Sequence, residues 1–200
     1  MPERPRLIRR EEAALVVIDV QERLAAVMPH RARVVAATSR LLRSAALLRM
    51  PIVVTRQNPA GLGDLVPEIA GLLEGPELAS ADVRVVDKIA FACTLEPAFV
   101  EAFTATGRSQ AVVCGMETHI CVAQTALSLD AAGCTTFVAA DACCSIDDGD
   151  AHVALDRMRR DRVVVTTSQA VMYEAVREAG TDEFRALLRV VKDQQASSSR

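Results

Sequence analysis

The sequence predicts an α/β domain in which a parallel sheet is covered by helices on both faces. Short apolar runs rich in β-branched residues, such as "AALVVIDV" and "QAVVCG", alternate with longer segments whose apolar residues recur every three to four positions. The short runs lack polar alternation, which is typical of strands buried on both faces. Half of the 200 residues are hydrophobic and only 3% are aromatic, so Ala, Val, Leu and Ile must build the core. These observations predict a three-layer α/β/α domain.

Six runs have the length and composition of buried strands. Pro51 separates the second run from the helical pattern before it, because proline cannot continue a helix. The predicted strands are, in order, 13–20, 51–56, 82–88, 110–115, 135–141 and 162–167.

The segments between these strands carry helical spacing and helix-end signals. Thr94 and Thr118 stand where N-caps are expected, and Gly107 and Gly133 follow the ends of the same two helices. The Pro- and Gly-containing stretch 58–64 is predicted to be a loop. The predicted helices are 31–50, 65–73, 95–106, 118–132, 148–161, 169–179 and 182–192. We expect one domain over 1–193 and a polar, disordered tail over 194–200.

Charge and cysteine usage narrow the class of function. The net charge is −3, which favours neither nucleic acid nor an anionic membrane as a partner. The start of the chain lacks the apolar segment of a signal peptide, and no run reaches the roughly 18 apolar residues of a membrane span. The six cysteines form no CxxC pair and no zinc-like Cys/His set. We therefore expect a cytoplasmic protein with reduced thiols and without a metal or cofactor.

Ligands of open parallel sheets bind at the carboxyl ends of the strands. This rule selects the following residues: Asp19, Arg56, Lys88, the 115–121 turn and Asp141. Asp19 closes an apolar strand, where it is either a catalytic acid or a structural cap. Lys88 is either solvated or directed toward Asp19, in which case it would keep that carboxylate ionised and lower the pKa of a nearby thiol.

Cys121 is the cysteine with the most reactive setting. It lies one turn into a predicted helix, where free backbone N–H groups and the helix dipole stabilise a thiolate or an oxyanion. A buried core thiol is the alternative. His119 is two residues away and therefore on a different helix face, so a rim position is favoured over a role as base. Cys143 and Cys144 are expected as free thiols in the loop after the fifth strand.

Several segments together resemble the isochorismatase-like cysteine hydrolase superfamily. They are "LVVIDVQERL", "DKIAF" and "VVCGMETHICVAQTALSLDAAG" followed by "FVAADACCS", and the resemblance covers roughly residues 10–192. The segments "QNPAGLGDLVPEI" and "RMRRDRVVVTTSQAVMYE" further resemble the subgroup of small isochorismatase-domain hydrolases whose substrates are mostly unassigned. The resemblance implies a Rossmann-like sheet of six parallel strands in the order 3-2-1-4-5-6.

The resemblance also implies a catalytic set. Asp19 would be the general base, Lys88 would orient it, and Cys121 would attack an acyl carbon to form a thioester. A cis peptide bond would join Met116 to Glu117, and the backbone N–H groups of Glu117 and Cys121 would form an oxyanion hole.

The sequence departs from the family pattern around the substrate. The region after the second strand has no His, whereas nicotinamidases of this superfamily hold a metal there with one Asp and two His. An aromatic residue is often found where this chain has Leu24, and Ala92 stands where a Ser often follows the residue equivalent to Phe91. Gln21, Leu24, Phe91 and His119 are the expected pocket residues.

The sequence thus predicts a metal-independent amidohydrolase that acts on a small C–N substrate. We expect a small-molecule substrate, no nucleic acid or membrane partner, and a homo-oligomer of two or more copies. Two alternatives stay open. One is ether hydrolysis of an isochorismate-like compound with Asp19 as the acid, and the other is a non-catalytic oligomeric binding protein on the same fold.

Overall fold

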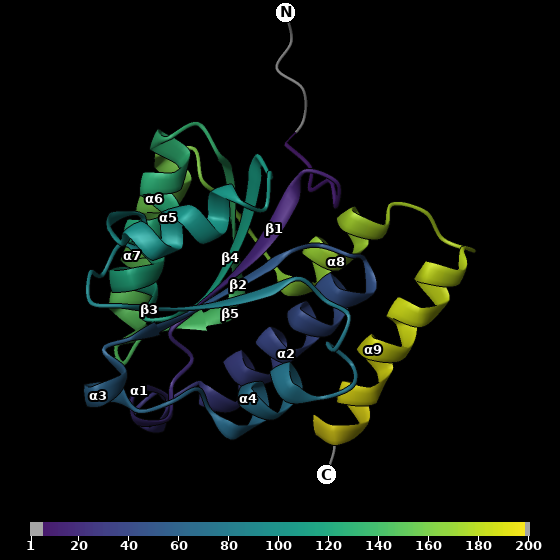
Figure 1. Cartoon of the computed structure of the whole chain (residues 1–200), viewed down its shortest axis with the longest axis horizontal. Helices are drawn as coiled ribbons and strands as arrows, with labels where there is room; N and C mark the ends of the chain where they lie inside the picture. Colours follow the sequence, from purple (N-terminus) through teal and green to yellow (C-terminus); the bar gives the residue numbers. More distant parts are fainter. Residues whose placement is uncertain (1–5, 199–200) are drawn as a thin grey trace, which may run out of the picture.

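A computed structural model describes residues 6–198 of the chain (Figure 1). Its six strands form one parallel sheet in the order β3-β2-β1-β4-β5-β6, which confirms the predicted class and strand order. The strands are β1 Ala13–Ile18, β2 Ile52–Gln57, β3 Val83–Lys88, β4 Gln110–Met116, β5 Thr135–Cys144 and β6 Val164–Thr166.

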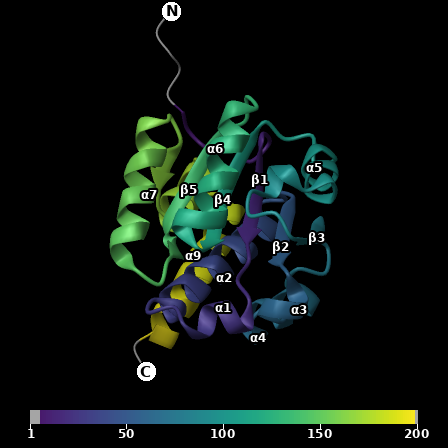
Figure 2. The same ribbon diagram turned by 90° about the vertical axis from the view of Figure 1, so that its left-hand side faces the viewer.

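Helices cover both faces of the sheet (Figures 1 and 2). One layer contains α2 Arg31–Leu47, α4 Pro67–Glu74, α8 Ser168–Val176 and α9 Asp182–Ser198, and the other contains α5 Pro97–Thr104, α6 Ala123–Ala131 and α7 Asp148–Arg160. Four short elements lie in the connections: α1 Glu22–Ala26, α3 Pro59–Leu62, a 3₁₀ turn η1 Cys93–Leu95 and a π-helical turn η2 Thr118–Val122. Among the described residues, no helix has both the length and the apolar character needed to cross a bilayer.

The central strands explain the continuous apolar runs in the sequence. Every residue of β1 and β4 is buried, whereas the edge strands β3 and β6 are partly exposed. β1 and β4 are neighbours, and the chain moves outward from them in opposite directions. This reversal is a topological switch point, where loops diverge and leave a place for a ligand beyond the strand ends.

Several local expectations were wrong. The predicted loop over 58–64 contains α3, and Thr94 lies inside η1 instead of capping α5, which begins after Glu96. The fifth strand continues to Cys144, so Cys143 and Cys144 lie in the sheet and not in a loop. The first strand was predicted over 13–20 but ends at Ile18, and the chain after it forms α1, which was not among the predicted helices. The last helix extends through Ser198, whereas we expected a disordered tail over 194–200; residues 199 and 200 lie outside the described part of the chain.

Candidate active site

Asp19 stands at the carboxyl end of β1 with its side chain fully buried. The strand pairing ends at Ile18 and Thr55, and Asp19 then adopts a left-handed backbone conformation with φ of 53°. The Thr55 hydroxyl donates a hydrogen bond to Asp19 Oδ1 over 2.7 Å. No hydroxyl or backbone N–H among the described residues serves the other oxygen, Oδ2. That oxygen is therefore available to an ammonium or a thiol.

Lys88 reaches Asp19 across the intervening strand β2. Its Nζ lies 2.7 Å from Asp19 Oδ2, and neither side chain has any exposed surface. Burial by itself lowers the pKa of Lys88, but Asp19, followed by Cys93 and Cys121, raises it above its ordinary value. The ammonium thus stays charged inside the protein, because a lysine with an adjacent carboxylate is more basic than an unpaired one.

Cys121 meets the same carboxylate from the η2 turn. Its side chain is 5% exposed, and the Asp19 carboxylate is close enough to act on the pKa of its thiol. Burial, and then Asp19, raises the pKa of Cys121 to about 12, and the Lys88 ammonium opposes this only in part. The position near a helix start, which favours a thiolate, is therefore not enough to lower the pKa of Cys121. Desolvation outweighs the favourable turn, so the thiol is neutral until a base takes its proton.

The turn that carries Cys121 is also built differently from the expected capped helix. Thr118 was predicted to be the N-cap, but its hydroxyl is buried and accepts or donates no hydrogen bond among the described residues. The backbone N–H of Val122 instead bonds to the Glu117 carbonyl over 3.2 Å, five residues back, which is the pattern of a π-turn. π-turns are frequent at functional sites, since they redirect one side chain within an otherwise regular helix.

The chain enters this turn through a close backbone approach. The peptide bond between Met116 and Glu117 is cis. Gly115 has a φ of +126°, and a Cβ at this position would lie 1.9 Å from the Ile18 carbonyl oxygen. Only glycine fits there, because any side chain would collide with the β1 backbone directly before Asp19. The orientation of the Glu117 and Cys121 backbone N–H groups toward an oxyanion stays a prediction.

His119 is held away from the thiol by the loop after β5. Its Nδ1 lies 2.9 Å from Ser145 Oγ, and its Nε2 lies 3.7 Å from Asp150 Oδ2. The same loop donates the Ile146 N–H to the Glu117 carboxylate over 2.9 Å. Among the described residues, the ring nitrogens of His119 thus contact Ser145 and Asp150 and not Cys121, and its position at the rim of a substrate pocket stays a prediction.

The other expected pocket residues differ in how far they are buried. Gln21 is fully buried and its amide is used by backbone groups of Gln57 and Gly63, so we correct it from a pocket residue to a structural one. Leu24 is partly buried against the core. Phe91 is 55% exposed, and its carbonyl oxygen lies 3.4 Å from Lys88 Nζ.

Two residues that the sequence analysis did not select also contact this group. Cys93 is fully buried, its backbone N–H donates a hydrogen bond to the Thr125 hydroxyl over 3.0 Å, and the Lys88 ammonium acts on the pKa of its thiol. Burial raises its pKa to about 11, so it too is a neutral thiol. Gln57 ends β2 and accepts a hydrogen bond from Lys88. Their positions shortly after Lys88 and at a strand end were the only sequence signals that pointed to them.

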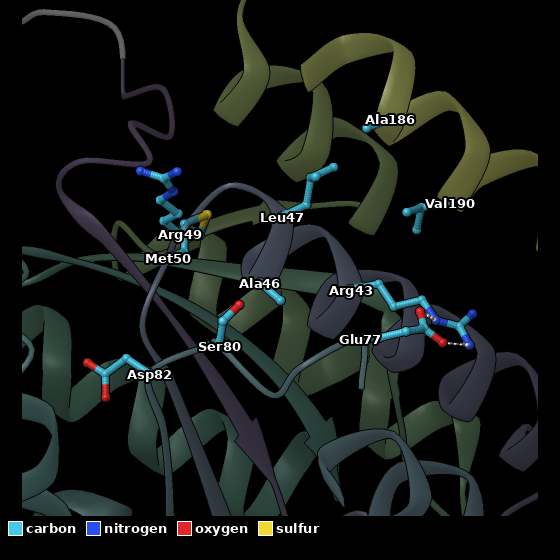
Figure 3. A pocket seen from close by; sticks show the side chains of 11 residues that line it. Arg43, Ala46, Leu47, Arg49, Met50, Glu77, Ser80, Asp82, Ala186 and Val190 are labelled. Atoms are coloured by element: carbon cyan, nitrogen blue, oxygen red, sulfur yellow. Dashed lines mark hydrogen bonds and ion pairs between the residues drawn. The ribbon is translucent and has the colours of Figure 1, made fainter. Parts of the chain in front are cut away.

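The described residues include no cluster of three or more His, Cys, Asp or Glu side chains suited to a metal ion. A cavity of about 750 Å³ does exist elsewhere, between α2, the segment before β3, and α9 (Figure 3). Met50 and Asp82, which line it, directly precede β2 and β3, so it lies at the amino ends of the strands. The Arg43–Glu77 ion pair borders it. The buried acid, ammonium and thiol at the opposite sheet end are the better candidate for chemistry.

Comparison with known proteins identifies the family of the chain. The Isochorismatase domain profile matches residues 13–170. The chain belongs to the isochorismatase domain family. The mouse isochorismatase domain-containing protein 2A is 33% identical over 184 residues, which cover 92% of this chain and 84% of the mouse protein.

Two solved structures extend the likeness to the fold. MAR1 ribonuclease from Caenorhabditis elegans superposes with a TM-score of 0.83 and 29% identity, over 93% of this chain and 92% of that protein. The YcaC gene product of Escherichia coli, described as an octameric hydrolase of unknown specificity, has a TM-score of 0.83 and 24% identity over 98% and 97% of the two chains. The fold of this chain is therefore that of the family's hydrolases.

Proposed function

We propose that this isochorismatase-family hydrolase cleaves the C–N bond of a small amide through a thioester on Cys121, with Asp19 and Lys88 as its partners. The observation that carries the proposal is a single buried carboxylate, Asp19, that pairs with the Lys88 ammonium over 2.7 Å and raises the pKa of the buried Cys121 thiol. A neutral thiol beside a buried carboxylate is a nucleophile next to a possible base.

Each half of the reaction uses the same proton carrier. Asp19 takes the thiol proton as Cys121 Sγ forms a bond to the acyl carbon. The C–N bond then breaks, and the amine leaves with that proton. Asp19 next takes a proton from water, whose oxygen attacks the thioester, and the proton returns to the sulfur as the acid is released. Lys88 stays protonated throughout and balances the negative charge that passes between Asp19 and Cys121.

The acyl intermediate gives the direct test. The protein is mixed with a library of small primary and secondary amides and quenched in acid, and its peptides are weighed. We expect an added acyl mass on the peptide that contains Cys121, and its absence from the Cys121→Ser protein. Turnover of an amide without any such adduct, together with full activity of Cys121→Ser, would contradict the thioester.

Because the similar protein from Caenorhabditis elegans is described as a ribonuclease, the screen also includes RNA as a substrate. We expect the protein to leave a single-stranded RNA intact under the conditions that acylate Cys121. RNA cleavage that persists in Cys121→Ser would instead point to a hydrolytic activity that does not use the thiol. The cytoplasmic location and the homo-oligomeric state stay predictions.

The pH dependence of thiol alkylation follows from the raised pKa of Cys121. Because that pKa is about 12, the thiolate fraction and the rate of labelling by iodoacetamide rise about tenfold per pH unit between pH 8 and 10. Asp19→Asn removes the negative charge that raises this pKa and leaves Lys88 unneutralised. We expect labelling at pH 8 to accelerate about tenfold or more in this variant, while amide turnover is lost.

Peptide mass mapping reads this experiment at each cysteine separately. Cys134 is partly exposed, lies away from the site and serves as the internal reference. Slower labelling of Cys121 in a folded Asp19→Asn protein, with Cys134 unchanged, would show that Asp19 does not hold the thiol in its neutral form.

A further inference from the structure

The Lys88 ammonium has two short contacts, and only one of them is to Asp19. Its second short contact is 2.5 Å to Gln57 Oε1, whereas the carbonyl oxygens of Ala90 and Phe91 lie at 3.3 and 3.4 Å. An ammonium has three hydrogens in a fixed tetrahedral arrangement. A strong acceptor on one hydrogen therefore sets the direction of the other two.

The amide of Gln57 is held in a single orientation. Its Nε2 donates to the Ile89 carbonyl over 2.6 Å, so its oxygen must face Lys88. Its backbone is held as well, because the Gln57 N–H donates to Gln21 Oε1 over 2.7 Å and Gln21 Nε2 donates back to the Gln57 carbonyl over 3.1 Å. Gln21 thus extends the β1–β2 pairing beyond its last residues and fixes the end of β2.

The charge of residue 57 matters as much as its position. The titratable groups that act on Lys88 are Asp19 from the end of β1, Cys93 from η1 and Cys121 from η2. At the end of β2, the residue that contacts the ammonium is an uncharged amide. Asp19 is therefore the carboxylate that the ammonium neutralises, and the pair carries no net charge before the thiol ionises.

We propose that Gln57 is a positioning residue of this site: its neutral amide oxygen takes one hydrogen of the Lys88 ammonium and directs another at Asp19. The effect of Gln57 on catalysis rests on the proposed function, whereas its effect on the Lys88 ammonium does not. Gln57 does not touch the reacting atoms and acts through Lys88. Losing it leaves a buried ammonium with one acceptor fewer, which disfavours the charged form.

The chain has only two lysines, Lys88 and the exposed Lys192, so the state of Lys88 can be read directly. Protein labelled with ¹³C,¹⁵N-lysine is titrated by NMR, with Lys192 as the reference in the same sample. In the wild type, we expect Lys88 to stay protonated above the ordinary pKa of a lysine. In Gln57→Met, which keeps the length of the side chain without its amide acceptor, we expect the Lys88 midpoint to fall by about one pH unit or more.

A matched control removes a buried amide elsewhere. Gln110 is also buried, and its amide joins backbone groups of Leu7 and Arg9 at the opposite end of the sheet. Gln110→Leu should leave the midpoint of the Lys88 titration unchanged. A folded Gln57→Met protein in which Lys88 keeps its wild-type midpoint would overturn the proposal, and so would an equal shift in Gln110→Leu.

Gln57→Glu decides the matter if Gln57→Met does not fold. The added carboxylate should keep Lys88 charged and raise the pKa of Cys121, which slows its alkylation at pH 9 by about tenfold; an unchanged rate would overturn the proposal. The Lys88 titration and the alkylation rate of Cys121 are both measured without turnover. An active Cys121→Ala protein would therefore refute the thioester mechanism and leave the proposal for Gln57 standing. In an active wild type, Gln57→Met should lower kcat and leave KM nearly unchanged.

Discussion

Replacing Cys121 with alanine is expected to lower kcat for an amide substrate by about 10⁴-fold or more, because no other group then accepts the acyl chain. The change removes one sulfur from a side chain that is already 5% exposed, so the fold should be retained. Initial rates on an amide found by acyl trapping measure the effect. Circular dichroism and thermal unfolding of the same preparation verify the fold.

Cys93→Ala is the matched control for this experiment. It deletes the same atom from a fully buried thiol that also lies beside Lys88 and Asp19. We expect its kcat to stay within about tenfold of the wild type, since the proposed mechanism gives Cys93 no bond to the acyl carbon. Full activity of Cys121→Ala would instead favour ether hydrolysis with Asp19 as the acid.

Lys88→Met is expected to destabilise the protein by about 3–5 kcal/mol, because it leaves Asp19 as an uncompensated buried charge. Both side chains of the pair are fully buried at 2.7 Å, so water cannot replace the lost ammonium. Urea unfolding at pH 7 measures the change in the free energy of unfolding. The double variant Asp19→Leu, Lys88→Met should recover much of this loss, because it removes the charge that the single variant leaves unpaired.

An exposed ion pair supplies the comparison. Arg56 lies one residue before Gln57 and pairs with Asp87 over 2.7 Å, with roughly half of the Asp87 side chain exposed. Arg56→Gln should cost no more than about 1 kcal/mol, since solvent screens such pairs. If Lys88→Met costs as little as Arg56→Gln, then the Lys88–Asp19 pair is not the buried charge unit described above.

Much of the architecture was predictable because its signals are local. A continuous apolar run is enough to indicate a strand buried on both faces, and β1 and β4 are buried along their whole length. The errors arose where a neighbouring strand decides the outcome. β5 extends to Cys144 because Gly115 and Met116 of β4 continue to pair with it, which no pattern within residues 141–144 reveals.

The candidate site divides in the same way. Asp19 and Lys88 were selected because each closes a strand, and Cys121 because it opens a helix. The sequence did not predict that Lys88 reaches past β2 to Asp19. This contact depends on the strand order and on the buried position of the Lys88 side chain beside Gln57. The helix-end effect that favours a thiolate at Cys121 is local and was visible in the sequence, but the burial that outweighs it and raises the pKa depends on the tertiary structure.

The sequence by itself determined the fold class and the three positions at which a carboxylate, an ammonium and a thiol stand. The spacing of apolar residues, the ends of strands and the starts of helices are properties of contiguous residues. They can therefore be predicted without a structure. Only the tertiary structure decided that these groups share one buried contact, that the resting thiol is neutral and that Gln57 holds the ammonium. Desolvation and hydrogen-bond direction come from residues far apart in the chain, and they set the charge state of each group.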